Sequence, residues 1–173
     1  MPDTQNFTTL NQLSRENFTQ IIGPVFEHSP WIAELAWEHR PFEGLADLHK
    51  ALCETVREAG EERQQALIAA HPDLVGRAAL AGTLTSASTS EQASAGLNQL
   101  SPSEVSLFQQ FNEEYRKKFG FPFVICARLN KKAAILGAFP ERLKNSRAEE
   151  INTALDEIYK IAYLRLQDIF GAD

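Results

Sequence analysis

His71 is the side chain best suited to proton transfer. Strong helix formers occupy residues 61–70, and Pro72 forces His71 out of the helical region. The imidazole is therefore expected at a helix C-terminus, where the helix dipole favours its protonated form and makes it a proton donor near neutral pH. A histidine that only caps helix carbonyls fits the same local sequence, so both interpretations stay open.

A second group of polar residues follows the hydroxyl-rich stretch 83–90, which contains Ser88. A helix is expected to begin near Glu91. Glu91 and Gln92 would then lie in its first turn, where free amides and the helix dipole favour anions. The alternative is an ordinary helix N-terminus with a hydroxyl cap and an acidic first turn.

Arg165 lies on the apolar stripe of the last predicted helix, in register with Ile158, Ala162 and Ile169. A guanidinium on such a face must extend to solvent, pair with a carboxylate or hold an anionic ligand. A carboxylate such as that of Glu91, or one on a substrate, would suit its planar fork.

Residues 121–126 have the composition of a β-strand, but no second strand is available to pair with them. We expect an extended segment within a helical protein. Its unpaired backbone groups could bind the edge of a polar heterocycle, with phenylalanines as walls. A simple interhelical connection rich in core aromatics is the alternative.

The elements that must position these residues are helices. Ser14, Ser29 with Pro30, Ser101 and Ser146 are expected to cap helix starts, and Gly60 and Gly120 to end helices. Apolar residues recur at helical spacing, for example at Leu45, Leu48, Leu52 and Val56, and at Ile151, Leu155 and Ile158. The predicted fold class is all-α, a helical bundle with one extended segment near 121–126 that lines the site.

Composition narrows the class of protein. With 173 residues the chain can bury a core without disulfides or a metal, and one domain is expected, residues 1–173 with a core over about 14–170. A net charge of −6 disfavours nucleic-acid and anionic-membrane binding. No signal peptide, membrane span or peroxisomal address is recognisable, and only Cys53 and Cys126 are present, so a cytoplasmic location is expected.

Motifs for phosphate, dinucleotide or zinc binding are missing, and an enzyme with this sequence is expected to need neither metal nor organic cofactor. A helical binding or scaffolding protein, and a cofactor-free hydrolase of ring amides, remain alternative functions.

Three motifs in order resemble the OHCU decarboxylases, where OHCU is 2-oxo-4-hydroxy-4-carboxy-5-ureidoimidazoline. They are residues 71–74 (HPDL), 89–97 (TSEQ…GL) and 112–123 (N…Y…KFGFPF). The resemblance covers nearly the whole chain. It implies an all-helical protein, usually a homodimer, that decarboxylates OHCU to (S)-allantoin in urate degradation without a cofactor.

The resemblance also implies the roles of individual residues. His71 and Glu91 match catalytic residues, with His71 as acid or base. The matched substrate-binding residues are Pro72, Ser88, Gln92, Phe123, Val124, Ile125 and Arg165. No metal ligand is implied. The partners are then OHCU and allantoin, with protonation of the intermediate on one face and no role for nucleic acid or membrane.

Overall fold

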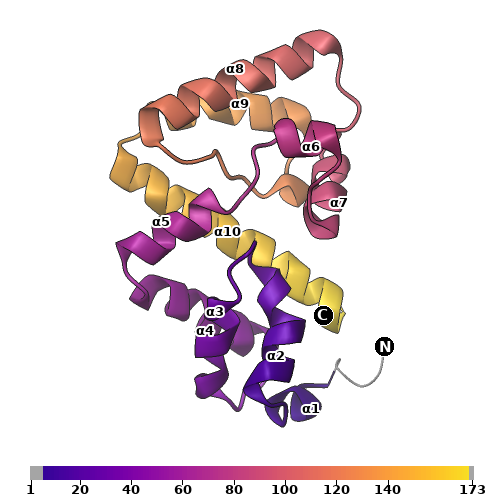
Figure 1. Ribbon diagram of the computed structural model, residues 1–173, viewed down its shortest axis with the longest axis vertical. Coiled ribbons are helices and arrows are strands. Elements are labelled where there is room, and N and C mark those ends of the chain that lie inside the picture. The colour runs from indigo at the N-terminus through magenta and orange to yellow at the C-terminus, as the bar shows by residue number, and fades with distance from the viewer. Residues whose placement is uncertain (1–5, 172–173) are drawn as a thin grey trace. The chain divides into compact units, whose positions relative to one another are not determined.

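The computed structural model describes residues 6–171, and all regular elements in this part of the chain are helices (Figure 1). The α-helices are α1 (Phe7–Asn11), α2 (Arg15–Ile22), α3 (Trp31–Ala36), α4 (Leu45–Glu58), α5 (Glu61–Ala69), α6 (Arg77–Ala81), α7 (Ser86–Ser94), α8 (Pro102–Phe119), α9 (Lys132–Leu143) and α10 (Arg147–Phe170). Three short 3₁₀ helices are η1 (Gly23–Val25), η2 (Trp37–His39) and η3 (Ala127–Leu129). The all-α prediction is confirmed.

The chain divides into two compact units. One contains the described residues up to Ala70 and those from Tyr159 on, and the other comprises His71–Ile158. Helix α10 contributes residues to both. The expected single domain over 1–173 stays a prediction, and the expectations drawn from the two chain ends, 1–5 and 172–173, lie outside the described residues.

The predicted caps explain where several helices begin and end. Ser14 accepts a hydrogen bond from the Asn17 amide at the start of α2. Ser101 and Glu104 exchange side-chain and backbone hydrogen bonds at the start of α8. Ser146 and Glu149 do the same at α10. These reciprocal contacts satisfy amides that a helix N-terminus leaves unpaired.

Two predicted helix starts were wrong. Pro30, not Ser29, occupies the cap position of α3, because the Ser29 hydroxyl donates to the Glu27 carbonyl. Helix α7 begins at Ser86 rather than near Glu91. Its cap is Thr85, whose hydroxyl accepts from the Ser88 amide at 3.2 Å, so the hydroxyl-rich stretch is helical.

Each unit has its own apolar core. In the first, α2, α3 and α4 pack together and bury Phe18, Ile22, Leu48 and Leu52 completely. In the second, α8 packs on α9, and aromatic rings fill the space between them and the segment 121–126. The rings of Phe123 and Phe139 stack with centroids 3.8 Å apart.

The extended segment is present as predicted. Residues 122–126 have no regular secondary structure, and residues 121–127 are all buried. None of the helices in the described part of the chain is long and apolar enough to cross a membrane.

Candidate functional site

His71 lies in the loop that joins α5 to α6. Helix α5 ends at Ala69, in agreement with the predicted effect of Pro72. The side chain of His71 is buried, with 7% of the residue exposed, and Pro72 beside it is half-buried. A buried histidine at the start of a loop has the enclosure that stereospecific proton transfer requires.

Two side-chain amides hold the peptide group between Leu74 and Val75. The Asn112 Nδ2 donates to the Leu74 carbonyl at 2.8 Å, and the Val75 amide donates to the Gln92 Oε1 at 3.2 Å. Both side chains are buried. Helices α7 and α8 therefore fix this loop three residues beyond His71.

The backbone of the same loop is unusual. Val75 has a φ of +54°, a left-handed conformation that is rare for a β-branched residue. At Gly76 a Cβ atom would meet the Asp73 Cβ at 2.6 Å, so the loop has no room for a side chain at this position. The conformation of residues 73–76 thus depends on contacts from neighbouring helices.

Ser88, Glu91 and Gln92 all lie on α7. Ser88 and Gln92 are buried and Glu91 is half-buried. Because α7 begins at Ser86, Glu91 and Gln92 are in its second half. The prediction that the free amides of a helix N-terminus surround them was therefore wrong. They lie three and four residues beyond Ser88, the last residue before the backbone bonds of the helix begin.

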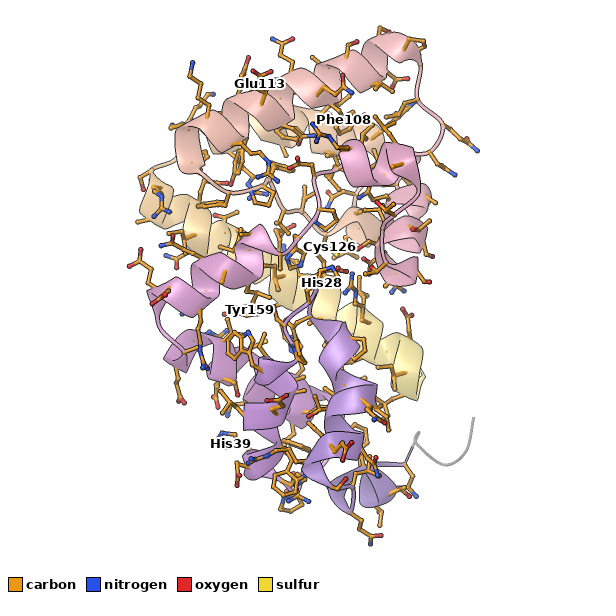
Figure 2. The ribbon with its side chains drawn as sticks, viewed as in Figure 1. His28, His39, Phe108, Glu113, Cys126 and Tyr159 are labelled. Atoms are coloured by element: carbon orange, nitrogen blue, oxygen red, sulfur yellow. The ribbon has the colours of Figure 1, made fainter. Side chains whose placement is uncertain are left out.

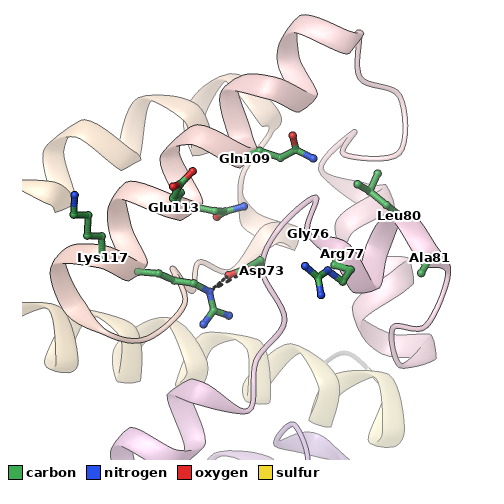
Figure 3. Close-up of a pocket in the computed structure, with 10 residues that line it drawn as sticks. Asp73, Gly76, Arg77, Leu80, Ala81, Gln109, Glu113 and Lys117 are labelled. Carbon is green, nitrogen blue, oxygen red and sulfur yellow. Dashed lines mark hydrogen bonds and ion pairs between the residues drawn. The ribbon is translucent and has the colours of Figure 1, made fainter.

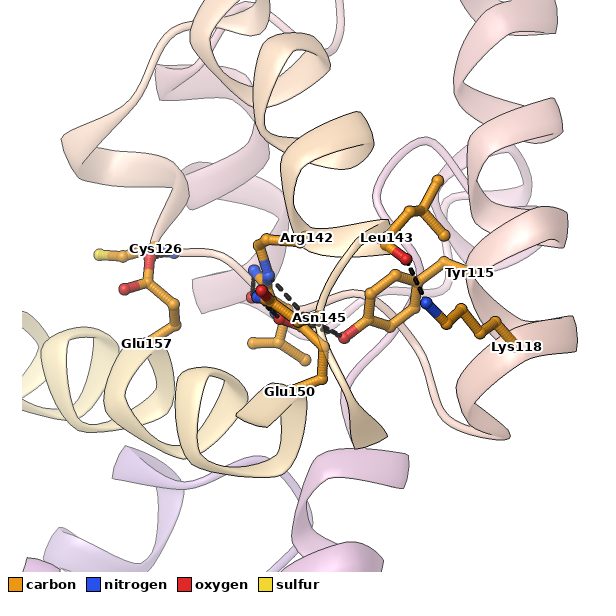
Figure 4. Close-up of polar contacts among 9 residues, drawn as sticks. Tyr115, Lys118, Cys126, Arg142, Leu143, Asn145, Glu150 and Glu157 are labelled. Atoms are coloured by element: carbon orange, nitrogen blue, oxygen red, sulfur yellow. Dashed lines mark hydrogen bonds and ion pairs between the residues drawn. The ribbon is translucent and has the colours of Figure 1, made fainter. Parts of the chain in front are cut away.

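Glu91 is close to the end of the extended segment. Burial raises the pKa of the Cys126 thiol, and the negative charges of Glu157 and Glu91 raise that pKa further. The Cys126 amide donates to the Glu157 Oε1 at 3.1 Å. Figure 4 shows Glu157 directed towards the backbone at Cys126. Helix α7 and the segment 123–126 thus border one region.

A buried network on the other side of the segment fixes the Val124 carbonyl. The Arg142 Nη1 donates to this oxygen at 2.6 Å, and its Nε donates to the Glu150 Oε1 at 2.8 Å. The Tyr115 hydroxyl donates to the same carboxylate, as does the Asn145 amide at 2.8 Å (Figure 4). Burial and the hydrogen bond to Glu150 raise the pKa of Tyr115.

Sequence reasoning missed this network, although a signal was present. Arg142 follows Ile135 and Phe139 at steps of four and three, so it occupies an apolar stripe in the same way as Arg165. Helix α9 was not among the predicted elements, and Pro140 lies inside it. Recognition of that helix would have predicted a buried guanidinium at Arg142, but its contact with Val124 follows only from the tertiary structure.

Arg165 pairs with Glu27, which the sequence had not singled out. The Arg165 Nη2 lies 2.8 Å from the Glu27 Oε1, and its Nη1 donates to the Pro24 carbonyl at 3.3 Å. Both side chains are almost completely buried. Of the three possibilities for Arg165, extension into solvent is excluded, and pairing with a carboxylate is observed, at Glu27.

The outer side of the loop borders a separate pocket of about 970 Å³ (Figure 3). Arg116 on α8 donates to both carboxylate oxygens of Asp73 at 3.0 and 3.1 Å there. Arg77, Gln109 and Lys117 also line it, and none of the predicted site residues does.

The unit His71–Ile158 thus contains eight of the nine predicted site residues. The Val75–Gln92 hydrogen bond links α7 to the loop after His71, and the charge of Glu91 links α7 to Cys126 at the end of the extended segment. Arg165 belongs to the other unit, so its convergence with His71 stays a prediction. No group of three or more His, Cys, Asp or Glu residues suited to a metal ion occurs among residues 6–171.

Fold and site together define an all-helical protein that buries a histidine, a serine, a carboxamide and an irregular backbone segment within one unit. Comparison with known proteins then identifies the family. The family model for OHCU decarboxylase matches residues 11–167. The chain belongs to the OHCU decarboxylase family, which makes it a carboxy-lyase.

Individual relatives agree with this assignment. The chain is 42% identical over 164 residues to the 2-oxo-4-hydroxy-4-carboxy-5-ureidoimidazoline decarboxylase of Haloferax volcanii, with 95% of each chain covered. It is 39% identical over 163 residues to that of Mus musculus, covering 94% of this chain and 92% of the relative.

Solved structures share the fold. A crystal structure of (S)-allantoin synthase matches with a TM-score of 0.76 at 24% identity, covering 95% of this chain and 54% of that one. A crystal structure of OHCU decarboxylase in the presence of (S)-allantoin matches with a TM-score of 0.69 at 23% identity, covering 92% of this chain and all of that one.

Proposed function

We propose that this protein converts OHCU to (S)-allantoin and carbon dioxide without a cofactor. In OHCU, one ring carbon carries both a hydroxyl and a carboxylate, and its neighbour is part of a C=N bond. When the bond to the carboxylate breaks, its electron pair moves towards the neighbouring carbon and displaces the C=N electrons onto nitrogen. The substrate therefore contains its own electron sink.

Three proton movements complete the reaction. The nitrogen that receives the C=N electrons takes up a proton, the hydroxyl loses its proton as the ring carbonyl forms, and the neighbouring carbon gains a proton on one face, which sets the (S) configuration. We assign the acid and base role to His71, with Glu91 orienting the imidazole or relaying the proton. General acid–base catalysis of this kind contributes roughly 10²–10⁴-fold, so orientation and electrostatics must supply the remainder.

The substrate contacts are assigned to Pro72, Ser88, Gln92, Arg165 and the segment 123–125. The Gln92 oxygen is used by the Val75 amide, so its Nε2 is the group available to donate to a ring or ureido oxygen. Arg165, whose guanidinium is fixed by Glu27, supplies positive charge to substrate oxygens. The Phe123 ring lies in the aromatic core, so Phe123 contributes its backbone.

The observation that carries the proposal is the backbone of the extended segment. Ile125 is only 8% exposed, yet neither its amide nor its carbonyl has a hydrogen-bond partner among the described residues. Its neighbours are paired: the Val124 carbonyl accepts from Arg142 and the Cys126 amide donates to Glu157. Unpaired buried backbone groups are costly, and an imidazoline edge with a donor and an acceptor would satisfy both.

The test is to generate OHCU in situ from urate with the two preceding enzymes and to follow circular dichroism as allantoin forms. Spontaneous decay gives racemic allantoin, so an optical signal that depends on this protein supports the proposal. Absence of a signal, with urate consumed, would contradict it. A hydrolase of ring amides would change the product without releasing carbon dioxide, and a binding protein would show no turnover.

The homodimer and the cytoplasmic location that the resemblance and the composition imply are proposals as well. Sedimentation velocity on the purified chain tests the first, since a monomer at micromolar concentration would contradict it.

A further inference from the structure

We propose that Asn112 is a positioning residue for the reaction. Together with Gln92 it clamps the Leu74–Val75 peptide group and so fixes the loop that carries His71. The inference rests on the proposed role of His71, and it adds a residue on α8 that does not itself contact the substrate.

The two amide side chains act on one rigid group. The carbonyl of Leu74 and the amide of Val75 belong to the same planar peptide, and they point in opposite directions. Asn112 donates to the carbonyl from α8 at 2.8 Å, and Gln92 accepts from the amide on α7 at 3.2 Å. Rotation of the peptide plane would break both hydrogen bonds, so the two amides restrain it.

The clamp holds a conformation that the loop would not choose by itself. Val75 has a φ of +54°, where its branched side chain is strained, and an unrestrained valine returns to negative φ. Such a change rotates the Leu74–Val75 peptide and alters the path of the chain back to His71. One turn further along α8, Arg116 binds Asp73, so α8 holds the loop at two points.

A buried asparagine at position 112 is not explained by core packing alone. It is 7% exposed, and its Oδ1 is buried with no hydrogen-bond partner in the described part of the chain. A leucine of similar volume would remove this unpaired oxygen. The donor on the same amide is the group that makes a defined contact, and that contact is to the His71 loop.

Proton transfer depends on the placement of the imidazole, and a displacement of about 1 Å can cost about 100-fold in rate. The variant Asn112→Leu should therefore lower kcat by about 10- to 100-fold and leave KM within about twofold. The matched control is Gln109→Leu, an exposed amide one turn earlier on α8, which should leave both constants unchanged. If the Asn112→Leu variant does not fold, Asn112→Asp takes its place, because aspartate also lacks the Nδ2 donor.

Two further variants separate positioning from a general effect on stability. Val75→Gly removes the strain, so the loss in kcat caused by Asn112→Leu should be at least fivefold smaller in the Val75→Gly background. In a His71→Asn background, Asn112→Leu should cause no additional loss, because the group that it positions is gone. If Asn112→Leu lowers kcat by the same factor in either background as in the wild-type chain, the inference is overturned. A wild-type kcat in Asn112→Leu alone would overturn it as well. A wild-type chain without turnover would instead contradict the proposed function.

Discussion

Arg165 and Glu27 form a buried ion pair between residues 138 positions apart, with 2.8 Å between the Arg165 Nη2 and the Glu27 Oε1. The side chains are 7% and 2% exposed. Two charges this deep are tolerated because their mutual attraction offsets the loss of hydration. Removal of one would leave the other charge buried without a partner. The pair explains how an arginine can occupy the apolar stripe of α10.

Replacement of Arg165 by leucine should therefore be costly, in contrast to the neutral effect expected for an arginine that merely extends to solvent. We expect Arg165→Leu to lower the free energy of unfolding by about 3 kcal/mol, measured by urea denaturation. The double variant Arg165→Leu with Glu27→Leu should recover most of this loss. A single variant as stable as the wild type would contradict a role of the pair in stability.

Local signals predicted much of the fold. The capping residues Ser14, Ser101 and Ser146 were recognised because their hydrogen bonds involve atoms within four residues along the chain. The start of α7 was placed wrongly because a run of serine and threonine favours both a loop and, with Thr85 as cap, a helix. In the helix that forms, the Thr89 hydroxyl donates to the Thr85 carbonyl one turn earlier.

The candidate site was less predictable than the helices. The sequence singled out His71, Ser88 and Gln92, and all three are buried. The residues that hold the site were not assigned that role, because Glu27, Arg142 and Asn112 act through contacts far apart in the sequence. Pairing of Arg165 with a carboxylate could be inferred from its position on an apolar face, but the identity of the carboxylate required the tertiary structure.

Substitution of His71 by asparagine tests its proposed role directly. We expect His71→Asn to lower kcat by about 10²–10⁴-fold in the coupled circular dichroism assay, because general acid–base catalysis is lost while the loop keeps a polar side chain. His39→Asn, at an exposed histidine (Figure 2), is the control and should have wild-type activity. Retained activity in His71→Asn would exclude the acid–base role.

Tyr115 should make the protein sensitive to alkali. Burial first, and then the hydrogen bond to Glu150, raise the pKa of its phenol above the ordinary value of 10.0. In the unfolded chain the phenol ionises from about pH 10, whereas in the folded chain it stays protonated. Its contribution to stability is therefore complete below pH 10 and is lost as pH rises from there towards the folded pKa.

The variant Tyr115→Phe measures that contribution. It should cost about 2 kcal/mol at pH 8, because the phenol donates to a buried carboxylate. The difference from wild type should narrow in urea denaturation above pH 10. Tyr163→Phe, at a more exposed ring, controls for loss of a phenol as such. A difference that is constant from pH 8 to pH 11 would contradict the raised pKa.

The loop after His71 offers a test that involves only one methyl group. An alanine at position 76 would bring its Cβ within 2.6 Å of the Asp73 Cβ, so the backbone must shift. We expect Gly76→Ala to lower kcat about tenfold or more, because the shift propagates to the buried imidazole five residues earlier.

Gly137→Ala in α9 is the matched control, since nothing lies within 4 Å of its Cβ position. It should keep full activity and gain about 0.5–1 kcal/mol of stability from the higher helix propensity of alanine. Equal activity in the two variants would show that the loop tolerates displacement and would remove the basis for assigning its conformation a part in catalysis.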